Sequence, residues 1–277
     1  MTGSPEPTGT VLAVAAAQPG DGTSTSVAEI VRSAAGCARV GAAVVDLPPV
    51  PGIPLGDLVA TVRERTGLLV RVTGSEATPL PELVDCGAHA LSCPLDASPE
   101  FVRELRAGAH ERGTAVHFLA RGSADLAVLR EIPDPAHVIL VFTGEARFST
   151  GAEFPGSTGS GENHGSPETS RASRSPRAGA RGTPSTVTEF ASAMELLPRG
   201  TGCTAAGVGS AGLPVLLAAL AAGAHVRIGR ADTPDYAPGT PARDDAQLVA
   251  RAAGVAKIAQ RPPLPPDQAA PALGIKT

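Results

Sequence analysis

The stretch "ALAAGAHVRIGRADTPDYAPGT" at residues 219–240 decides the fold class. Its segment "HVRIG" has the branched residues of a strand, and side chains alternate between the two faces of a strand. Val226 and Ile228 therefore share one face and are expected to pack under helices, while Arg227 lies on the other face. A turn rich in Pro and Gly follows. This order places Arg227 near the C-terminal end of its strand, where parallel sheets and β/α barrels bind ligands.

Short runs of branched residues alternate with helix-like segments along the rest of the chain. Eight runs have strand character, and they lie at residues 10–17, 42–48, 68–74, 88–93, 114–120, 137–142, 201–209 and 225–229. Segments with the apolar spacing of helices separate them, and in the first of these Ser26 and Glu29 have the spacing of a capping box. Strand and helix in alternation predict an α/β fold, specifically a (β/α)8 TIM barrel that forms a single domain over residues 1–277.

Composition excludes several classes of function. The net charge of −4 and the aromatic content of 3% give no basis for nucleic-acid binding. No apolar stretch reaches the length of a membrane span, and the N-terminus lacks the pattern of a signal peptide, so a cytoplasmic protein is expected. The four cysteines form no CxxC pair and are expected to be reduced structural thiols.

A low-complexity insertion interrupts the pattern between the sixth strand and the sixth helix. Residues 149–184 are dominated by Gly, Ser, Pro, Arg and Thr, and they offer almost nothing to bury. We expect this segment to be disordered. A tolerated surface insertion is favoured over an active-site lid or a basic tether, because exposed loops accept extra length at little cost.

The C-terminal region resembles a known enzyme family. The stretch "GAHVRIGRADTPDYAPGTPARDDAQLVARAAGVAKIAQ" at residues 223–260, with "PPDQAAPALGI" at 265–275, is similar to the C-terminal signature of the beta-keto acid cleavage enzymes, the family of 3-keto-5-aminohexanoate cleavage enzyme. Within it, "AQLVARA" and "GAHVRIG" carry the closest likeness. The stretch "AEIVRSAAGCARVGAAVVDLP" at residues 28–48 resembles the first helix and second strand of that family.

This resemblance implies a β/α barrel that converts a β-keto acid and acetyl-CoA, its co-substrate, into acetoacetate and a new CoA ester. It also implies zinc, held by a His-x-His at the end of the second strand and by a Glu after the last strand. Here Asp46 and Pro48 replace the two histidines, and Ala231 replaces the glutamate. Asp46 is the one metal-ligand candidate left, and a single carboxylate makes a weak zinc site, so we expect the usual zinc site to be absent.

Other family positions keep their chemistry. Arg227 and Asp232 match the Arg and Asp that, by resemblance, position the substrate and manage its proton, and Thr73 lies where the family often has a serine that contacts substrate. An Arg beside an Asp at a barrel mouth can bind a carboxylate and tune a base. An ordinary ion pair at the barrel rim is the alternative.

A glycine-rich motif is a second candidate for ligand contact. "GVGSAG" at residues 207–212 follows a predicted strand, so Gly207, Gly209 and Ser210 could contact phosphate or CoA. It fails as a Rossmann fingerprint because no complete dinucleotide-binding half follows it. A simple tight turn is the competing interpretation.

Two histidines could form a relocated metal site with Asp46. His89 and His117 both fall within predicted strands, and either could point into the barrel. A lone histidine in a strand is more often a core residue with a satisfied hydrogen bond, and we favour that interpretation.

Two functions from different classes therefore stay open. The chain is either an active acyltransferase of the family with a modified or metal-free site, or a catalytically degenerate barrel that binds a small carboxylate or CoA ester through Arg227 without turnover. The expected partner is in both cases a small-molecule β-keto acid or carboxylate. Members of the family often associate, so a homo-oligomer is also expected.

The insertion gives a direct prediction. Limited proteolysis of the purified chain should cut first between Ser149 and Pro184, because a segment without a core exposes its backbone to proteases. Mass spectrometry of the first fragments locates the cut. Protection of this segment, with first cuts elsewhere, would instead indicate an ordered lid.

Overall fold

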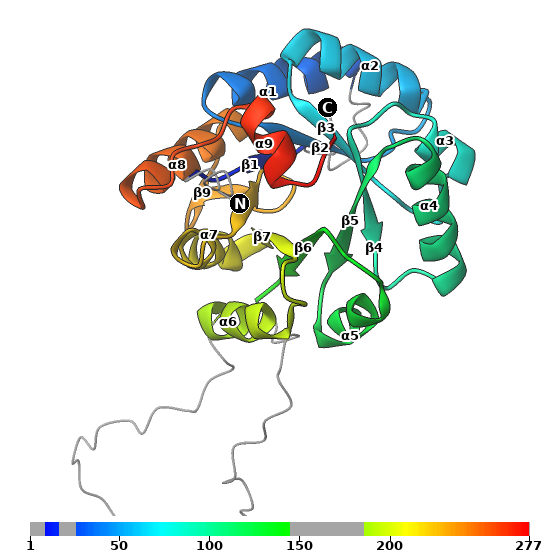
Figure 1. Cartoon of the computed structure of the whole chain (residues 1–277). Helices are drawn as coiled ribbons and strands as arrows, with labels where there is room; N and C mark the ends of the chain where they lie inside the picture. The colour runs from blue at the N-terminus through cyan, green and yellow to red at the C-terminus, as the bar shows by residue number, and fades with distance from the viewer. Residues whose placement is uncertain (1–8, 17–25, 145–185, 277) are drawn as a thin grey trace, which may run out of the picture.

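Eight parallel strands close into a barrel in the computed structural model, which describes residues 9–16, 26–144 and 186–276 (Figure 1). The strands neighbour one another in chain order, and the first also pairs with the eighth. They are β1 Leu12–Ala15, β2 Val44–Leu47, β3 Leu69–Thr73, β4 Ala90–Pro94, β5 Ala115–Ala120, β6 His137–Phe142, β7 Gly202–Gly207 and β8 His225–Ile228. The expected (β/α)8 barrel is confirmed. The insertion expected at residues 149–184 falls between β6 and α6, outside the described residues.

Helices surround the barrel as an outer ring (Figure 1). The ring and its additions are α1 Val27–Arg39, α2 Leu55–Thr66, α3 Leu80–Val84, α4 Pro99–Glu111, α5 Ser123–Glu131, α6 Thr186–Leu196, α7 Gly212–Ala221, α8 Asp245–Ile258 and α9 Pro266–Ala272. The predicted capping box is present at the start of α1, where Ser26 and Glu29 bond to each other's backbone amides. None of the helices among the described residues combines the length and the apolar character needed to cross a membrane. All four cysteines are free and buried.

Strand β8 shows how the alternation of side chains sorts residues between two environments. Val226 and Ile228 join the apolar layer between the barrel and its helices, which also contains Leu248 and Val249 of α8. Arg227 takes the opposite face and points into the barrel, where its side chain contacts two carboxylates. A short hairpin of β9 Asp235–Ala237 and β10 Thr240–Pro241 leads from β8 to α8.

Helix α9 closes the N-terminal end of the barrel. A separate apolar cluster joins it to the first residues of the strands, and this cluster contains Val11, Ala43, Leu69, Ala90, Ala269, Ala270, Leu273 and Ile275 among others. Figure 1 shows the short α9 lying across this end. This cluster makes α9 a cover over the N-terminal end of the barrel. The opposite, C-terminal mouth is the end that stays open to ligands.

Three histidines lie inside the barrel near the closed end. The ring centroids of His117 and His137 are 4.7 Å apart, and those of His137 and His225 are 6.0 Å apart. Burial lowers the pKa of His117 to about 3 and that of His225 to about 4, and it holds the pKa of His137 well below its usual value. The three imidazoles are therefore neutral in the folded protein at neutral pH.

These histidines predict sensitivity to acid. The unfolded chain takes up protons at a histidine pKa near 6.5, whereas the folded chain does not, so the free energy of unfolding should fall as pH drops from about 6.5 toward 4. Each histidine can contribute at most about 1.4 kcal/mol per pH unit over this range. Urea unfolding followed by circular dichroism at pH 7.5, 6 and 5 measures the slope.

One variant assigns part of the slope to the buried cluster. His225→Gln should make the pH dependence shallower by about one histidine. Asp232 has the opposite effect on the pH dependence of stability, because burial raises the pKa of its carboxyl group. It is a single group against three histidines. A free energy of unfolding that is equal at pH 7.5 and pH 5 would contradict the predicted sensitivity to acid.

Candidate functional site

Two ion pairs lie next to each other inside the barrel. Arg227 donates from Nε and Nη2 to the two carboxylate oxygens of Asp232, over 3.0 and 2.8 Å. Arg71 of β3 donates from Nε and Nη2 to the two oxygens of Asp46 on β2, over 2.7 Å in each case. The pairs meet where Nη1 of Arg227 lies 3.8 Å from Oδ2 of Asp46. Each guanidinium thus forms a two-pronged contact with its own carboxylate, which is the strongest geometry for such pairs.

The charges in this cluster balance. Two carboxylates face two guanidiniums, and all four side chains are largely shielded from water. Charges in such an environment need partners, because burial of an unpaired ion costs several kcal/mol. The cluster is therefore a coupled unit in which the loss of one member leaves another without its counter-charge.

The network continues from Arg71 to the closed end of the barrel. Nη1 of Arg71 lies 3.1 Å from Nδ1 of His117, and Nε2 of His117 lies 2.9 Å from the carbonyl oxygen of Leu273. A guanidinium can only donate and a carbonyl can only accept. His117 is consequently neutral, with its proton on Nε2, and a second proton on Nδ1 would face Arg71. This contact and burial explain the low pKa of His117.

Asp232 is the acid–base candidate of the cluster. It lies in the turn after β8, and burial raises the pKa of its carboxyl group while the charge of Arg227 lowers it. A buried carboxyl group with a raised pKa is a candidate to exchange a proton with a bound substrate. Arg227 is the binding candidate, because its Nη1 is not used in the pair with Asp232.

The glycine-rich turn after β7 packs directly on the turn that carries Asp232. The Gly209 amide donates to the carbonyl oxygen of Asp232 over 2.9 Å, and the Thr233 hydroxyl donates to the carbonyl oxygen of Gly207 over 3.0 Å. Gly207 is buried, whereas Gly209 and Ser210 are exposed at the mouth. The structure thus brings the predicted CoA-contact motif next to the predicted acid.

Thr73 ends β3 on the mouth side of Arg71. It is two residues beyond Arg71 in the same strand, so the two side chains lie on the same face of the strand. Thr73 is half-buried, and it neighbours Ser92 of β4 in the strand register. This position lies above the Asp46–Arg71 pair, at the level where a ligand would enter.

The residues that the resemblance places at the metal position do not fit zinc. Both oxygens of Asp46 already accept hydrogen bonds from Arg71, and a second guanidinium approaches from Arg227. A cation placed there would face two positive charges. Pro48 and Ala231, at the other two positions, have no atom that can coordinate a metal.

A relocated site from Asp46, His89 and His117 does not form either. His117 points into the barrel, but His89 precedes β4 instead of lying within it, which corrects the sequence-based assignment. Nδ1 of His89 accepts a hydrogen bond from the Val70 amide at the N-terminal end of the strands. This bond to the backbone of β3 holds the His89 ring in place. Across residues 9–16, 26–144 and 186–276, no group of three His, Cys, Asp or Glu side chains is placed to hold a metal.

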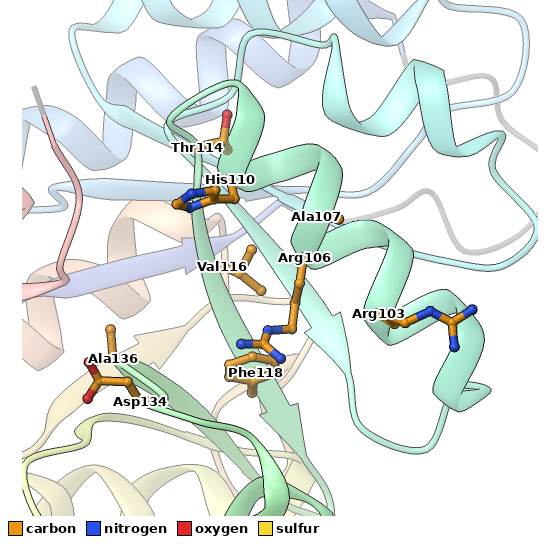
Figure 2. Close-up of a pocket in the computed structure, with 9 residues that line it drawn as sticks. All are labelled: Arg103, Arg106, Ala107, His110, Thr114, Val116, Phe118, Asp134 and Ala136. Atoms are coloured by element: carbon orange, nitrogen blue, oxygen red, sulfur yellow. The ribbon is translucent and has the colours of Figure 1, made fainter.

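A groove on the outside of the barrel is not a second site of the same kind. It runs between α4, the outer face of β5 and the turn before β6 (Figure 2). Arg106 lies over the ring of Phe118 at 5.9 Å, while Arg103 points away along α4. Its polar side chains do not converge on one point, and none of the sequence-predicted site residues lines it.

Arg71 is the residue that sequence reasoning missed. The signal for it was present in "LLVRVTG", where an arginine interrupts a strand of buried branched residues. Arginine is rarely buried without a partner, so this position called for a carboxylate nearby. What the sequence did not show is which of the chain's many acidic residues would be that partner.

Packing of the two mouth turns predicts unequal effects of substitution at the motif glycines. A Cβ at Gly207 would lie 2.4 Å from the Ala211 carbonyl oxygen, a contact with backbone that requires the turn to shift. Gly209 has φ of +58° with open space around it, so alanine there costs only about 1 kcal/mol of backbone strain. We expect Gly207→Ala to lower the free energy of unfolding by about 2 kcal/mol or more. Urea unfolding of both variants tests this, and equal losses would contradict it.

Comparisons with known proteins bear on both the fold and the family. Two solved structures of ObcA superpose on this chain. The apo structure has a TM-score of 0.59 and 13% identity, and the match covers 92% of this chain and 66% of ObcA. The ternary complex of ObcA with a C4-CoA adduct and oxalate has a TM-score of 0.58 and 14% identity, and the match covers 91% of this chain and 67% of ObcA. The chain thus spans about two thirds of the length of ObcA. KGPDC from Streptococcus mutans has a TM-score of 0.52 and 11% identity, over 89% of this chain and 97% of that protein. At these identities the likeness shows the fold.

The sequence comparison is more specific. No curated protein sequence matches the chain. The family model described as beta-keto acid cleavage enzyme matches residues 175–275, which include β7, α7, β8, α8 and α9 together with Arg227 and Asp232. This match bears out the resemblance of the C-terminal part of the chain to the beta-keto acid cleavage enzymes, and it falls on an eight-stranded β/α barrel.

Proposed function

We propose that this barrel binds a small carboxylate, such as a β-keto acid or its CoA ester, at Arg227 and Asp232, and that it does so without the zinc ion of its family. The observation that carries this proposal is the contact between Arg71 and both oxygens of Asp46. It places a fixed positive side chain against the single remaining metal-ligand candidate.

The geometry around Arg227 supports an anionic ligand. Nη1 of Arg227 is the guanidinium nitrogen outside the pair with Asp232, and a guanidinium binds carboxylates well. Arg227 retains slight exposure, whereas Arg71 has almost none, so a ligand that enters from the mouth reaches Arg227 first. Asp232 then lies beside the bound carboxylate with a raised pKa.

A CoA ester fits the same mouth. Gly209 and Ser210 are exposed on the turn that contacts the backbone of Asp232, so an acyl group near Arg227 would place its CoA part along this turn. The ObcA complex supports this choice of ligand, since it holds a C4-CoA adduct and oxalate in a protein of similar fold.

Catalysis is expected to be weak. The family reaction, acyl transfer between a β-keto acid and acetyl-CoA, depends by resemblance on a metal that polarises the keto group. Loss of a Lewis acid removes several kcal/mol of transition-state stabilisation, which is a rate loss of roughly several hundred-fold or more. Arg227 and Asp232 can still bind the substrate and move a proton. The proposal therefore favours carboxylate binding over efficient cleavage.

Metal analysis and binding measurements on the purified protein test this proposal together. We expect substoichiometric zinc, poor or absent cleavage of β-keto acids in the presence of acetyl-CoA, no stimulation by added zinc, and measurable binding of acetoacetate by calorimetry. Arg227→Met should weaken acetoacetate binding by about tenfold or more, since it removes a charged hydrogen-bond donor. Arg103→Met, on the outside of α4, is the matched control and should bind as the parent does.

Two results would overturn the proposal. Stoichiometric zinc with rapid turnover would show that metal ligands come from elsewhere in the chain. Acetoacetate binding that is equal in the parent protein and in Arg227→Met would remove Arg227 from the site.

A further inference from the structure

The side chain of Arg227 lies between two carboxylates that compete for it. It forms two hydrogen bonds with Asp232, at 2.8 and 3.0 Å, while its third nitrogen is 3.8 Å from Asp46. A small rotation of either side chain would turn the longer contact into a hydrogen bond. The choice between the two carboxylates therefore decides whether Nη1 of Arg227 is available to a ligand.

Arg71 binds Asp46 from the side of the closed end of the barrel. Its Nε and Nη2 occupy both oxygens of Asp46, and its Nη1 contacts His117. The side chain of Arg71 is only 1% exposed, so it cannot reach a ligand at the mouth. Its contact toward Arg227 runs through Asp46.

The surroundings make Asp46 depend on this neutralisation. Its side chain is 7% exposed, and the two guanidiniums are the cations that contact it. Charges attract strongly at short range where water is excluded. If Arg71 were absent, the carboxylate of Asp46 would have one cationic neighbour left, and that neighbour is Arg227.

We propose that Arg71 is a positioning residue for the ligand site: it neutralises Asp46 and thereby keeps Arg227 paired with Asp232 and open to the incoming carboxylate. This inference rests on the function proposed above. It also gives a reason why the substitution of a histidine by Asp46 is compatible with a ligand site, because the added negative charge is cancelled within the barrel.

A cycle of three proteins tests the inference through acetoacetate binding. Arg71→Met should weaken binding by about tenfold or more, because Asp46 then draws Nη1 of Arg227 away from the ligand. Adding Asp46→Asn to that variant removes the competing charge, and binding should return to within about threefold of the parent. Arg261→Met is the control, since Arg261 lies at the other end of the barrel, where it donates to the backbone carbonyls of Ala224 and Gly9.

A second readout needs no ligand. The Nε–Hε signal of Arg227 in a ¹⁵N NMR spectrum reports its bond to Asp232, and it is assigned by its loss in Arg227→Lys. This signal should shift in Arg71→Met and return toward the parent position in the double variant. If Arg71→Met does not fold, Arg71→Lys takes its place, because lysine keeps the charge but cannot form the two-pronged contact, and a smaller change in the same direction is expected.

The outcomes separate the two proposals. An unchanged Nε–Hε signal, or a double variant that binds as weakly as Arg71→Met, would overturn the role of Arg71. A parent protein that binds no acetoacetate, with the signal shifting and recovering as described, would overturn the proposed function and leave the positioning role standing.

Discussion

The buried contact between Asp46 and Arg71 is the interaction on which the interior of this barrel depends. It joins β2 to β3, and through its two ends it connects the mouth with the closed base. On one side Asp46 approaches Arg227 and its partner Asp232, and on the other Arg71 contacts His117, which reaches the carbonyl of Leu273 beyond α9. A barrel interior is usually filled with branched apolar side chains. In this barrel a continuous series of polar contacts crosses the interior, and each side chain in the series contacts the next.

This arrangement restricts what the site can do. A buried network is costly unless every member has its partner, and the balance of two carboxylates and two guanidiniums meets that condition without a metal. A zinc ion would need the oxygens of Asp46 that Arg71 now occupies. In the proposed function, the same guanidinium that occupies Asp46 leaves the neighbouring Arg227 available to an anion. The departures from the family pattern at Asp46, Pro48 and Ala231 are thus consistent with one another.

The match with the family model falls on part of the frame around the site. The match with the family model covers the last strands and helices, where the turns after β7 and β8 pack on each other through Gly207, Gly209 and Thr233. Gly207 is required there by close approach of the Ala211 backbone. Close packing of the backbone therefore explains the glycine at position 207 of this motif. The exposed residues Gly209 and Ser210 are the ones available to a ligand.

The sequence by itself determined the barrel, because alternating faces and repeated strand–helix order are local properties of the chain. It placed Arg227 inside and Val226 outside, and by resemblance it pointed to Asp46, Pro48 and Ala231 as replacements of zinc ligands. It did not reveal that Arg71 pairs with Asp46, that His89 lies outside the strand, or that His117 is neutral. Those facts depend on which side chains from distant strands meet at the same level of the barrel, and strand register across a closed sheet decides that. Only the tertiary structure could show that a guanidinium binds both oxygens of Asp46.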